Sequence, residues 1–220
     1  MSNTDEAIFR EVDEDVRTDE YKRLWDRFGK YIIGLAVVVV ASVAGFQGWN
    51  FYQIKQAELA SAIYLDAVKK AADGKNEDAL AAFAAVKHNG FGQLAQLRVV
   101  QMSADKGDID KAVAAYDAFA ADVKNDSALA DLARIRAGYL LVDTAKSDEL
   151  LTRLVRFDKE GDAWRNEARE ILGLAAWREK NYVGAKKQMD LIFADPKAPG
   201  AMRQRAQILI QLITPNLPQK

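Results

Sequence analysis

A long uncharged run near the N-terminus constrains this chain more than any other feature. From Tyr31 to Trp49 the sequence contains no Asp, Glu, Lys or Arg, and the uncharged run continues to Ile54. A helix rises about 1.5 Å per residue, so residues 31–49 alone would span roughly 28 Å, close to the hydrocarbon thickness of a bilayer. The sequence therefore predicts one transmembrane helix over residues 31–54, with most of the chain after it.

The charges that flank this run predict the direction in which it crosses the membrane. Only Lys55 follows the run closely, whereas five basic residues precede it: Arg17, Lys22, Arg23, Arg27 and Lys30. Because Lys and Arg resist translocation, we expect a single-pass protein of the bacterial inner membrane, with a cytoplasmic N-terminus and a periplasmic C-terminal domain. Aromatic residues bracket the run, as is typical of rings at the headgroup level: Trp25, Phe28, Tyr31, Trp49, Phe51 and Tyr52.

Two other interpretations of the run compete with a membrane span. Ser42-Val43-Ala44 has the pattern of a signal-peptide cleavage site, but 30 residues precede the run, far more than the short basic segment of a signal peptide. A buried core helix would rarely remain uncharged over such a length. We therefore favour the transmembrane helix.

Small residues within the run predict a face where another helix could approach. Ala41 and Gly45 lie one helical turn apart, as do Ala44 and Gly48. Small side chains allow two helix backbones to come close in a bilayer. Glycine is also common in spanning helices that make no such contact, so this face is a prediction about packing in the membrane.

The segment before the run divides into two parts. Residues 1–20 are strongly acidic and cannot bury enough apolar surface to fold alone, so we expect a disordered cytoplasmic tail. Ile8, Val12 and Val16 recur every four residues, which also fits a helix formed with a partner. Residues 21–30 combine aromatic and basic side chains, and are predicted to form a basic amphipathic segment beside the membrane.

Composition argues against most enzyme chemistry. The chain has no cysteine, His88 is its only histidine, and the net charge is −1. Without a thiol, and with one histidine, the usual nucleophile and metal constellations cannot be assembled. The isolated glycines Gly74 and Gly107 look like helix ends and not like a phosphate-binding loop. We expect no catalytic, cofactor-binding or metal site, no cofactor, no small-molecule substrate and no nucleic-acid partner.

The remainder of the chain, residues 55–214, reads as a series of helices with a periodic pattern of breaks. The turns that end in Ala79, Ala112, Leu150 and Ala185 are spaced by 33, 38 and 35 residues. Four residues after each of these final positions stands a large side chain, in order Phe83, Tyr116, Leu154 and Met189. This spacing resembles the 34-residue tetratricopeptide repeat, in which a small residue lets the two helices pack closely and a large one fills the seam.

The repeat pattern predicts an all-α solenoid continuous with the membrane helix. No break occurs after Trp49 until Asp73-Gly74, so the membrane helix should supply the first helix of the first repeat. We expect about four degenerate repeats over residues 57–195, the third having Leu150 where alanine is usual. Gly173 adds a close-packing position in the fourth. A helix over residues 201–213 should cap the solenoid, leaving residues 215–220 as a tail. The alternative is an irregular α-bundle.

The whole layout resembles the ancillary SecYEG translocon subunit family (YfgM-type). The resemblance covers a short tail, the basic-aromatic lead Trp25–Tyr31, a glycine-containing span ending near Trp49, and a continuous helix into a small repeat domain. It implies a membrane protein at the SecYEG protein-export translocon. It also implies cooperation with periplasmic chaperones, such as a PpiD-type protein, and a tail exposed to regulation or proteolysis.

Three functions fit these observations. The first is an ancillary translocon subunit that links emerging proteins to periplasmic chaperones. The second is a scaffold for another envelope assembly, such as outer-membrane or respiratory-complex biogenesis. The third is a regulator that acts through the acidic cytoplasmic tail. The resemblance favours the first.

Overall fold

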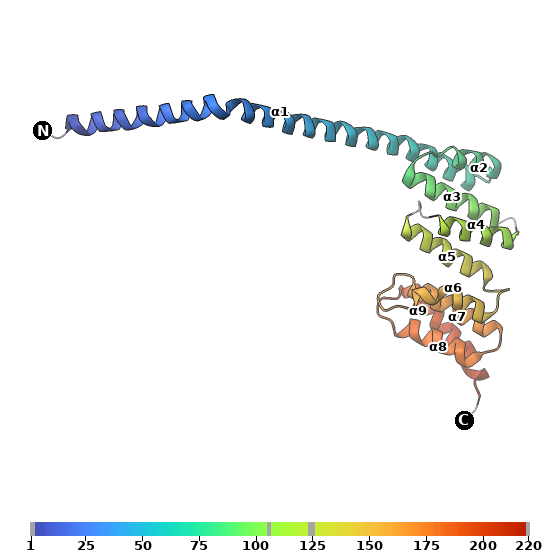
Figure 1. Cartoon of the computed structure of the whole chain (residues 1–220). Coiled ribbons are helices and arrows are strands. Elements are labelled where there is room, and N and C mark those ends of the chain that lie inside the picture. Colours follow the sequence, from blue (N-terminus) through green and yellow to red (C-terminus); the bar gives the residue numbers. More distant parts are fainter. Residues whose placement is uncertain (1–2, 105–106, 123–125, 219–220) are drawn as a thin grey trace. The chain divides into compact units, whose positions relative to one another are not determined.

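The computed structural model describes the backbone of residues 3–104, 107–122 and 126–218. Side chains are described for Lys22 and, within those ranges, from Trp25 onward. All the regular structure in the described ranges is helical, and no strand occurs in them (Figure 1). The predicted all-α class is confirmed. The chain divides into two compact units, residues 1–58 and residues 59–220, which are described separately.

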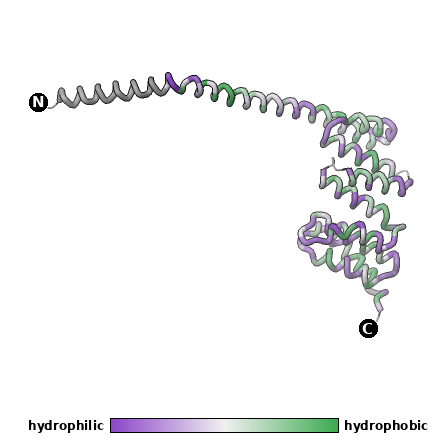
Figure 2. Tube along the Cα trace, viewed as in Figure 1, coloured by the Kyte–Doolittle hydropathy of each residue, from purple (hydrophilic) through white to green (hydrophobic). Residues whose placement is uncertain are grey.

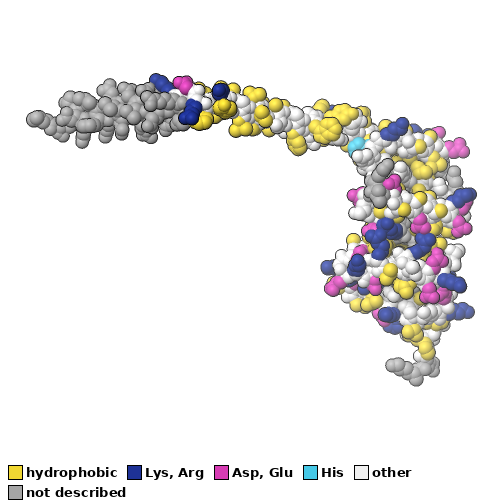
Figure 3. All heavy atoms as spheres, in the orientation of Figure 1, with side chains coloured by type: hydrophobic (Ala, Val, Ile, Leu, Met, Phe, Trp, Pro, Cys, Tyr) yellow, Lys and Arg dark blue, Asp and Glu magenta, His cyan; other side chains and the backbone are white. Residues whose placement is uncertain are grey.

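Helix α1 (Asn3–Ala72) contains the predicted membrane span. From Trp25 onward it is long and apolar enough to cross a membrane by length and composition, and its most apolar stretch is not buried. Figure 2 shows the change from hydrophilic to hydrophobic colouring where the uncharged run begins. Figure 3 shows Lys and Arg gathered just before the hydrophobic side chains of this helix. Exposed apolar surface on this scale is expected to be covered by lipid or by another protein.

Aromatic rings at both ends of the run lie close to basic side chains. The Lys30 Nζ atom is 5.2 Å from the centre of the Tyr31 ring, and the Lys55 Nζ atom is 5.8 Å from the centre of the Phe51 ring. Rings with a neighbouring cation suit the polar headgroup region of a bilayer. The backbone of residues 3–20 belongs to α1, but their side chains lie outside the described residues, so the disordered tail stays a prediction.

The second unit consists of the end of α1 and a series of helix pairs. Neighbouring helices along the chain pack against each other, as Figure 1 shows for α2 to α9. The last turns of α1 therefore form the first helix of the solenoid, as the uninterrupted helical pattern predicts. The remaining elements are α2 (Asn76–Ala84), α3 (Asn89–Ala104), α4 (Ile109–Ala121), α5 (Ser127–Leu141), α6 (Ser147–Leu154), η1 (Val155–Phe157), α7 (Arg165–Arg178), α8 (Tyr182–Ala194), α9 (Gly200–Ile213) and η2 (Thr214–Asn216).

The turns within three of the repeats share one backbone conformation. Gly74 and Gly107 have φ values of 77° and 90°, in the left-handed region where glycine has no Cβ penalty. Lys180 occupies the equivalent position before α8 and has φ 62°, which costs a residue with a side chain more than it costs glycine. The helices α4 and α8, which follow Gly107 and Lys180, are capped by side chains: Asp108 accepts from the Lys111 N–H, and Asn181 accepts from the Gly184 N–H.

The third repeat departs from this pattern. Its second helix, α6, is only eight residues long and continues into η1, and the connection to α7 includes Gly161 at φ 84°. Leu150, which stands where the other repeats have alanine, is fully buried. The predicted C-terminal tail also begins with structure, because η2 includes Pro215 and Leu217 packs against the last apolar cluster. An apolar residue there covers part of the open end of the solenoid.

Buried apolar residues form three successive clusters along the solenoid. The first joins the end of α1 with α2 and α3 around Phe83. The second joins α3 to α7 around Ile135, Leu154 and Phe157. The third joins α7 to α9 around Met189 and Ile213. Each helix pair thus shares its apolar cluster with a neighbouring pair, which is the behaviour of a repeat protein.

Candidate functional site

The predicted repeat-packing positions all lie inside the solenoid. Each of the nine side chains or glycines is buried at an interface between helices, and the set is Ala79, Phe83, Ala112, Tyr116, Leu150, Leu154, Gly173, Ala185 and Met189. Gly173 permits the closest approach, since a Cβ there would lie 2.1 Å from the Met189 Cε atom and 3.2 Å from the Gln188 Cβ atom. Gly173 therefore lets α7 approach α8 closely at Met189, and the packing role of the nine positions stays a prediction.

The small residues of the membrane run lie on the surface of α1. Ala41, Ala44, Gly45 and Gly48 are exposed, and a Cβ added at Gly45 or Gly48 would meet no atom within 4 Å. Nothing in the described chain covers this face. The predicted helix–helix contact in the membrane therefore stays a prediction.

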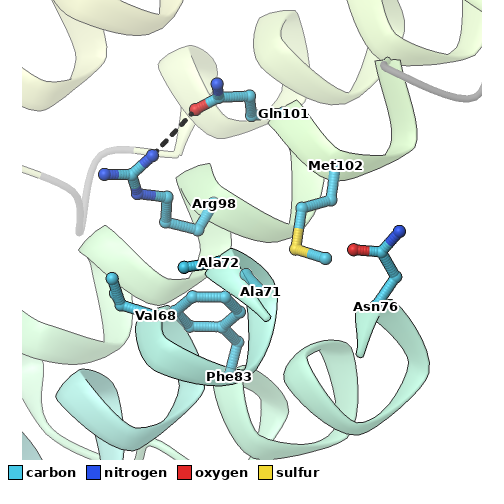
Figure 4. Close-up of a pocket in the computed structure, with 8 residues that line it drawn as sticks. All are labelled: Val68, Ala71, Ala72, Asn76, Phe83, Arg98, Gln101 and Met102. Carbon is cyan, nitrogen blue, oxygen red and sulfur yellow. Dashed lines mark hydrogen bonds between the residues drawn. The ribbon is translucent and has the colours of Figure 1, made fainter. Parts of the chain in front are cut away.

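The first helices of the successive repeats share a surface with two neighbouring cavities. One, of about 190 Å³, lies between α1, α3, α4 and α5, and is lined by Tyr64, Leu94, Leu97, Arg98, Gln101, Tyr116, Leu132 and Arg136. The other, of about 300 Å³, lies between α1, α2 and α3, and shares Arg98 and Gln101 with the first. Figure 4 shows Arg98 donating to Gln101 on one side of the second cavity, with Val68 and Phe83 on the other. We call the surface formed by Arg98, Arg136 and the two cavities the arginine groove.

The charges of the arginine groove are not balanced within it. Arg98 and Arg136 are both exposed, and none of the described residues that line either cavity is an Asp or a Glu. The Arg98 guanidinium lies 3.3 Å from the Gln101 Oε1 atom, and Arg136 has no hydrogen bond or ion pair with any described residue. Two guanidinium groups beside apolar walls form a surface that attracts carboxylates.

The same helix surface is closed in the last repeats. Glu170 on α7 is buried and accepts hydrogen bonds from the Tyr139 hydroxyl at 2.7 Å and from the Arg205 Nε atom at 2.8 Å. Burial and the neighbouring Glu170 carboxylate raise the pKa of the Tyr139 hydroxyl, because both disfavour its anionic form. One carboxylate therefore joins α5, α7 and α9, and its charge is compensated inside the chain.

A second buried carboxylate joins the two helices of the fourth repeat. Asp195 follows α8 and accepts from the Arg165 Nη2 atom at 2.6 Å, from the Lys197 N–H at 2.9 Å and from the Asn166 side chain at 3.1 Å. These donors, the Arg165 guanidinium first among them, hold the pKa of the Asp195 carboxyl well below its usual range. Arg178 similarly donates to the Val142 and Ala145 carbonyl oxygens that follow α5.

The sequence predictions did not include these polar residues. Arg98 and Arg136 are 38 residues apart, the same spacing that separates Ala112 from Leu150, so they occupy corresponding places in successive repeats. The ion pair of Arg205 with Glu170 likewise joins residues 35 apart, about one repeat. A search for charged residues spaced by one repeat would have identified these positions, although not which of them are paired.

Potential metal ligands are dispersed among the described residues. Those residues contain no group of three or more His, Cys, Asp or Glu side chains that could hold a metal ion. His88 lies just before α3, with its ring 5.9 Å from the Phe91 ring, and its Nδ1 atom is buried without a hydrogen-bond partner. This single ring has no nucleophile or carboxylate bonded to it among the described residues.

Comparisons with known proteins agree with this architecture. A family model described as "Tetratricopeptide repeat-like domain" matches residues 22–205. The "Ancillary SecYEG translocon subunit" of Escherichia coli (strain K12) is 28% identical over 175 residues, which cover 79% of this chain and 84% of that protein. No solved structure matches. The resemblance predicted from the sequence is confirmed, and the chain belongs to the tetratricopeptide repeat-like domain family.

Proposed function

We propose that this protein is an ancillary subunit of the SecYEG protein-export translocon, anchored in the bacterial inner membrane, which links emerging proteins to periplasmic chaperones. The observation that carries the proposal is the similarity to the Escherichia coli ancillary SecYEG translocon subunit over 79% of the chain. That similarity extends over most of both proteins, so it includes more than an isolated repeat.

The orientation in the proposal is supported by the charges around the span. Basic residues precede the uncharged run, and only Lys55 follows it closely. By the positive-inside rule, the repeat domain then lies in the periplasm, where chaperones meet proteins that leave the channel. Since the chain contains no cysteine, single-cysteine variants allow a direct test. In spheroplasts, a membrane-impermeant maleimide should label Ser103→Cys at once and Thr18→Cys only after lysis; the reverse order would contradict this orientation.

The repeat domain supports a role in protein binding and not in catalysis. Its helices stack so that apolar residues are used for packing, while the arginine groove keeps two guanidinium groups available to a partner. Repeat solenoids of this kind present extended binding surfaces. A subunit that gathers partners at the channel requires such a surface together with a membrane anchor.

Purification of the full chain from its own membranes in mild detergent, followed by quantitative mass spectrometry, tests the proposal. We expect enrichment of the translocon subunits and of a membrane-anchored periplasmic chaperone, relative to an unrelated single-pass protein carrying the same tag. Enrichment of an outer-membrane or respiratory assembly in their place would contradict the proposal.

The predicted helix-contact face gives this experiment a matched control. Gly45→Leu with Gly48→Leu places bulk on the small face, whereas Val43→Leu adds bulk on the opposite side of the same helix. We expect the first variant to lose translocon subunits during purification and the second to retain them. Equal recovery with both variants would show that this face makes no contact with the channel.

A further inference from the structure

We propose that the arginine groove binds an acidic polypeptide segment that carries large apolar side chains, with Arg98 and Arg136 contacting its carboxylates. The inference rests on the proposed protein-binding function and names the chemistry of the segment that the groove recognises. It follows from the charges, the cavities and the register of the helices.

The charge of the groove argues for a carboxylate ligand. Seven of the other eight arginines of the repeat domain form ion pairs with Asp or Glu of the chain itself, whereas Arg203 on the exposed face of α9 forms none with any described residue; the seven are Arg134, Arg153, Arg156, Arg165, Arg169, Arg178 and Arg205. Arg98 and Arg136 form none with any described residue, although they lie at the same cavity. A partner carboxylate would supply the missing acceptor, and Arg binds carboxylates through two parallel hydrogen bonds.

The cavities beside these arginines argue for apolar side chains in the same ligand. Leu94, Leu97 and Leu132 contribute to the smaller cavity of about 190 Å³, and Val68 and Phe83 contribute to the larger cavity of about 300 Å³. An apolar cavity of about 150 Å³ accepts a benzene ring. Each cavity therefore has room for one large apolar side chain, next to a guanidinium group at its rim.

The register of the helices predicts how the acidic residues are spaced. Leu94 and Arg98 on α3 correspond to Leu132 and Arg136 on α5, 38 residues later, so the same leucine–arginine pair is repeated on adjacent helices. Neighbouring helix axes are separated by about 8–10 Å, and a peptide in the polyproline II conformation rises about 3.1 Å per residue with three residues per turn, so residues three apart share a face. Two carboxylates about three residues apart would then reach the two arginines, with apolar residues between them.

An anionic lipid is the other ligand that combines a negative charge with apolar groups. The two cavities share the Arg98–Gln101 pair between them, so they form two compartments with a polar rim. An acyl chain would favour one long apolar channel, whereas successive side chains of a peptide suit separate compartments. The peptide is therefore the ligand that this geometry favours.

Fluorescence anisotropy with the purified full chain in detergent micelles tests the proposal. The probe is a fluorescein-labelled ten-residue peptide that contains Glu-Leu-Phe-Glu, compared with peptides in which both Glu are Gln, both Glu are Lys, or Leu and Phe are both Ser. We expect the first peptide to bind at least about tenfold more tightly than each of the others, because both the carboxylates and the apolar groups contribute. Binding should also weaken with added salt.

Variants of the chain locate the site. Arg98→Gln or Arg136→Gln should each weaken binding of the acidic peptide by about tenfold, and the double variant should weaken it further. The double variant Lys187→Gln with Arg203→Gln removes the same charge from exposed positions on α8 and α9, and should bind within about twofold of the unaltered chain. Circular dichroism of each variant at 222 nm shows whether the helices are intact.

Several results would overturn the proposal. These are equal binding of the acidic and Lys-containing peptides, equal loss with both double variants, or full displacement of the peptide by vesicles of anionic phospholipid, which would identify a lipid site. A change in oligomeric state of the Arg98→Gln, Arg136→Gln double variant, measured by light scattering, would identify a second copy as the occupant. If translocon subunits still co-purify with the chain while peptide binding fails, only this inference is lost.

Discussion

Arginine side chains are used differently at the two ends of the repeat domain. Around α3 and α5, Arg98 and Arg136 are exposed beside cavities of about 190 and 300 Å³, and no Asp or Glu of the described chain lines these cavities. Around α7 and α9, Arg205 and Arg165 bind the buried carboxylates of Glu170 and Asp195. The second arrangement closes the surface between helices, and the first leaves it available.

This difference shows that charged side chains have two roles in a solenoid, which are joining helices and binding a partner. A carboxylate supplied by the chain itself joins helices across repeats, but it must be fully hydrogen-bonded to offset the free-energy cost of its desolvation. A guanidinium without such a carboxylate contributes little to holding the helices together. We call the region around α7 and α9, with Glu170 and Asp195, the closed end of the repeat domain. Its stability should be sensitive to the loss of one charge. The arginine groove should keep its stability after such a loss, and only its binding should weaken.

The largest loss of stability is expected at the closed end, from Glu170→Ala. The substitution leaves the Tyr139 hydroxyl without its acceptor and opens space between α5, α7 and α9. We expect the free energy of unfolding to fall by about 2–4 kcal/mol. Thermal unfolding of the full chain in detergent, followed at 222 nm, measures the loss. Glu160→Ala removes the same charge from an exposed position and should leave the midpoint unchanged; equal effects would contradict the role of Glu170.

A smaller loss is expected from Gly173→Ala, which tests packing in the same region. The new Cβ would lie 2.1 Å from the Met189 Cε atom, and Met189 is fully buried, so α7 and α8 must separate or Met189 must repack. Overpacking of this kind costs about 1–3 kcal/mol. Gly200→Ala is the control, since its Cβ would meet nothing within 4 Å and alanine favours the helix. A Gly173→Ala variant as stable as the Gly200→Ala variant would show that the interface between α7 and α8 can accommodate an added methyl group.

The closed end should also respond to acid through Asp195. Hydrogen bonds from Arg165, Lys197 and Asn166 lower the pKa of this carboxyl in the folded chain, whereas it keeps its ordinary value when unfolded. The resulting stabilisation is present above the unfolded pKa and is lost as the pH falls below it toward the folded value. The unfolding midpoint of the unaltered chain should therefore drop more steeply below about pH 4 than that of Asp195→Asn. Parallel pH profiles for the two chains would argue against this linkage.

The smallest stability change is a gain, expected from Lys180→Gly. Lys180 has φ 62° in the turn where the earlier repeats have Gly74 and Gly107, so glycine removes a conformational cost of about 0.5–1 kcal/mol. Lys146→Gly, in the corresponding turn of the third repeat, should reduce stability, because its φ of −69° gives glycine no advantage. Comparison of the two unfolding midpoints checks the sign. A lower midpoint for Lys180→Gly would mean that the lysine side chain contributes to the turn.

Much of this fold could be predicted from the sequence because its determinants are local. The uncharged run indicated a helix apolar enough to cross a membrane, and Gly74 and Gly107 marked turns where the chain needs a positive φ. The spacing of Ala79, Ala112 and Ala185 indicated which helices pack closely. The departure from the repeat pattern at Leu150, where alanine is usual, also corresponds to a structural difference, since the third repeat has the short helix α6.

The arginine groove could not be predicted in the same way. Whether Arg98 or Arg205 is paired depends on which side chains face it from a neighbouring repeat, and that depends on the stacking of helices 30 or more residues apart in the sequence. Glu170 and Arg205 are 35 residues apart, and their chemistry resembles that of many exposed pairs. Only the stacked structure reveals that one arginine meets a buried carboxylate while another meets a cavity.

The most direct test of the contrast is one experiment on the Arg98→Gln, Arg136→Gln double variant of the full chain. Its thermal unfolding midpoint and its affinity for the acidic Glu-Leu-Phe-Glu peptide are measured side by side. We predict a free energy of unfolding within about 0.5 kcal/mol of the unaltered chain, as for exposed charges, together with loss of peptide binding. A drop in stability comparable to that of Glu170→Ala, or undiminished peptide binding, would contradict the account.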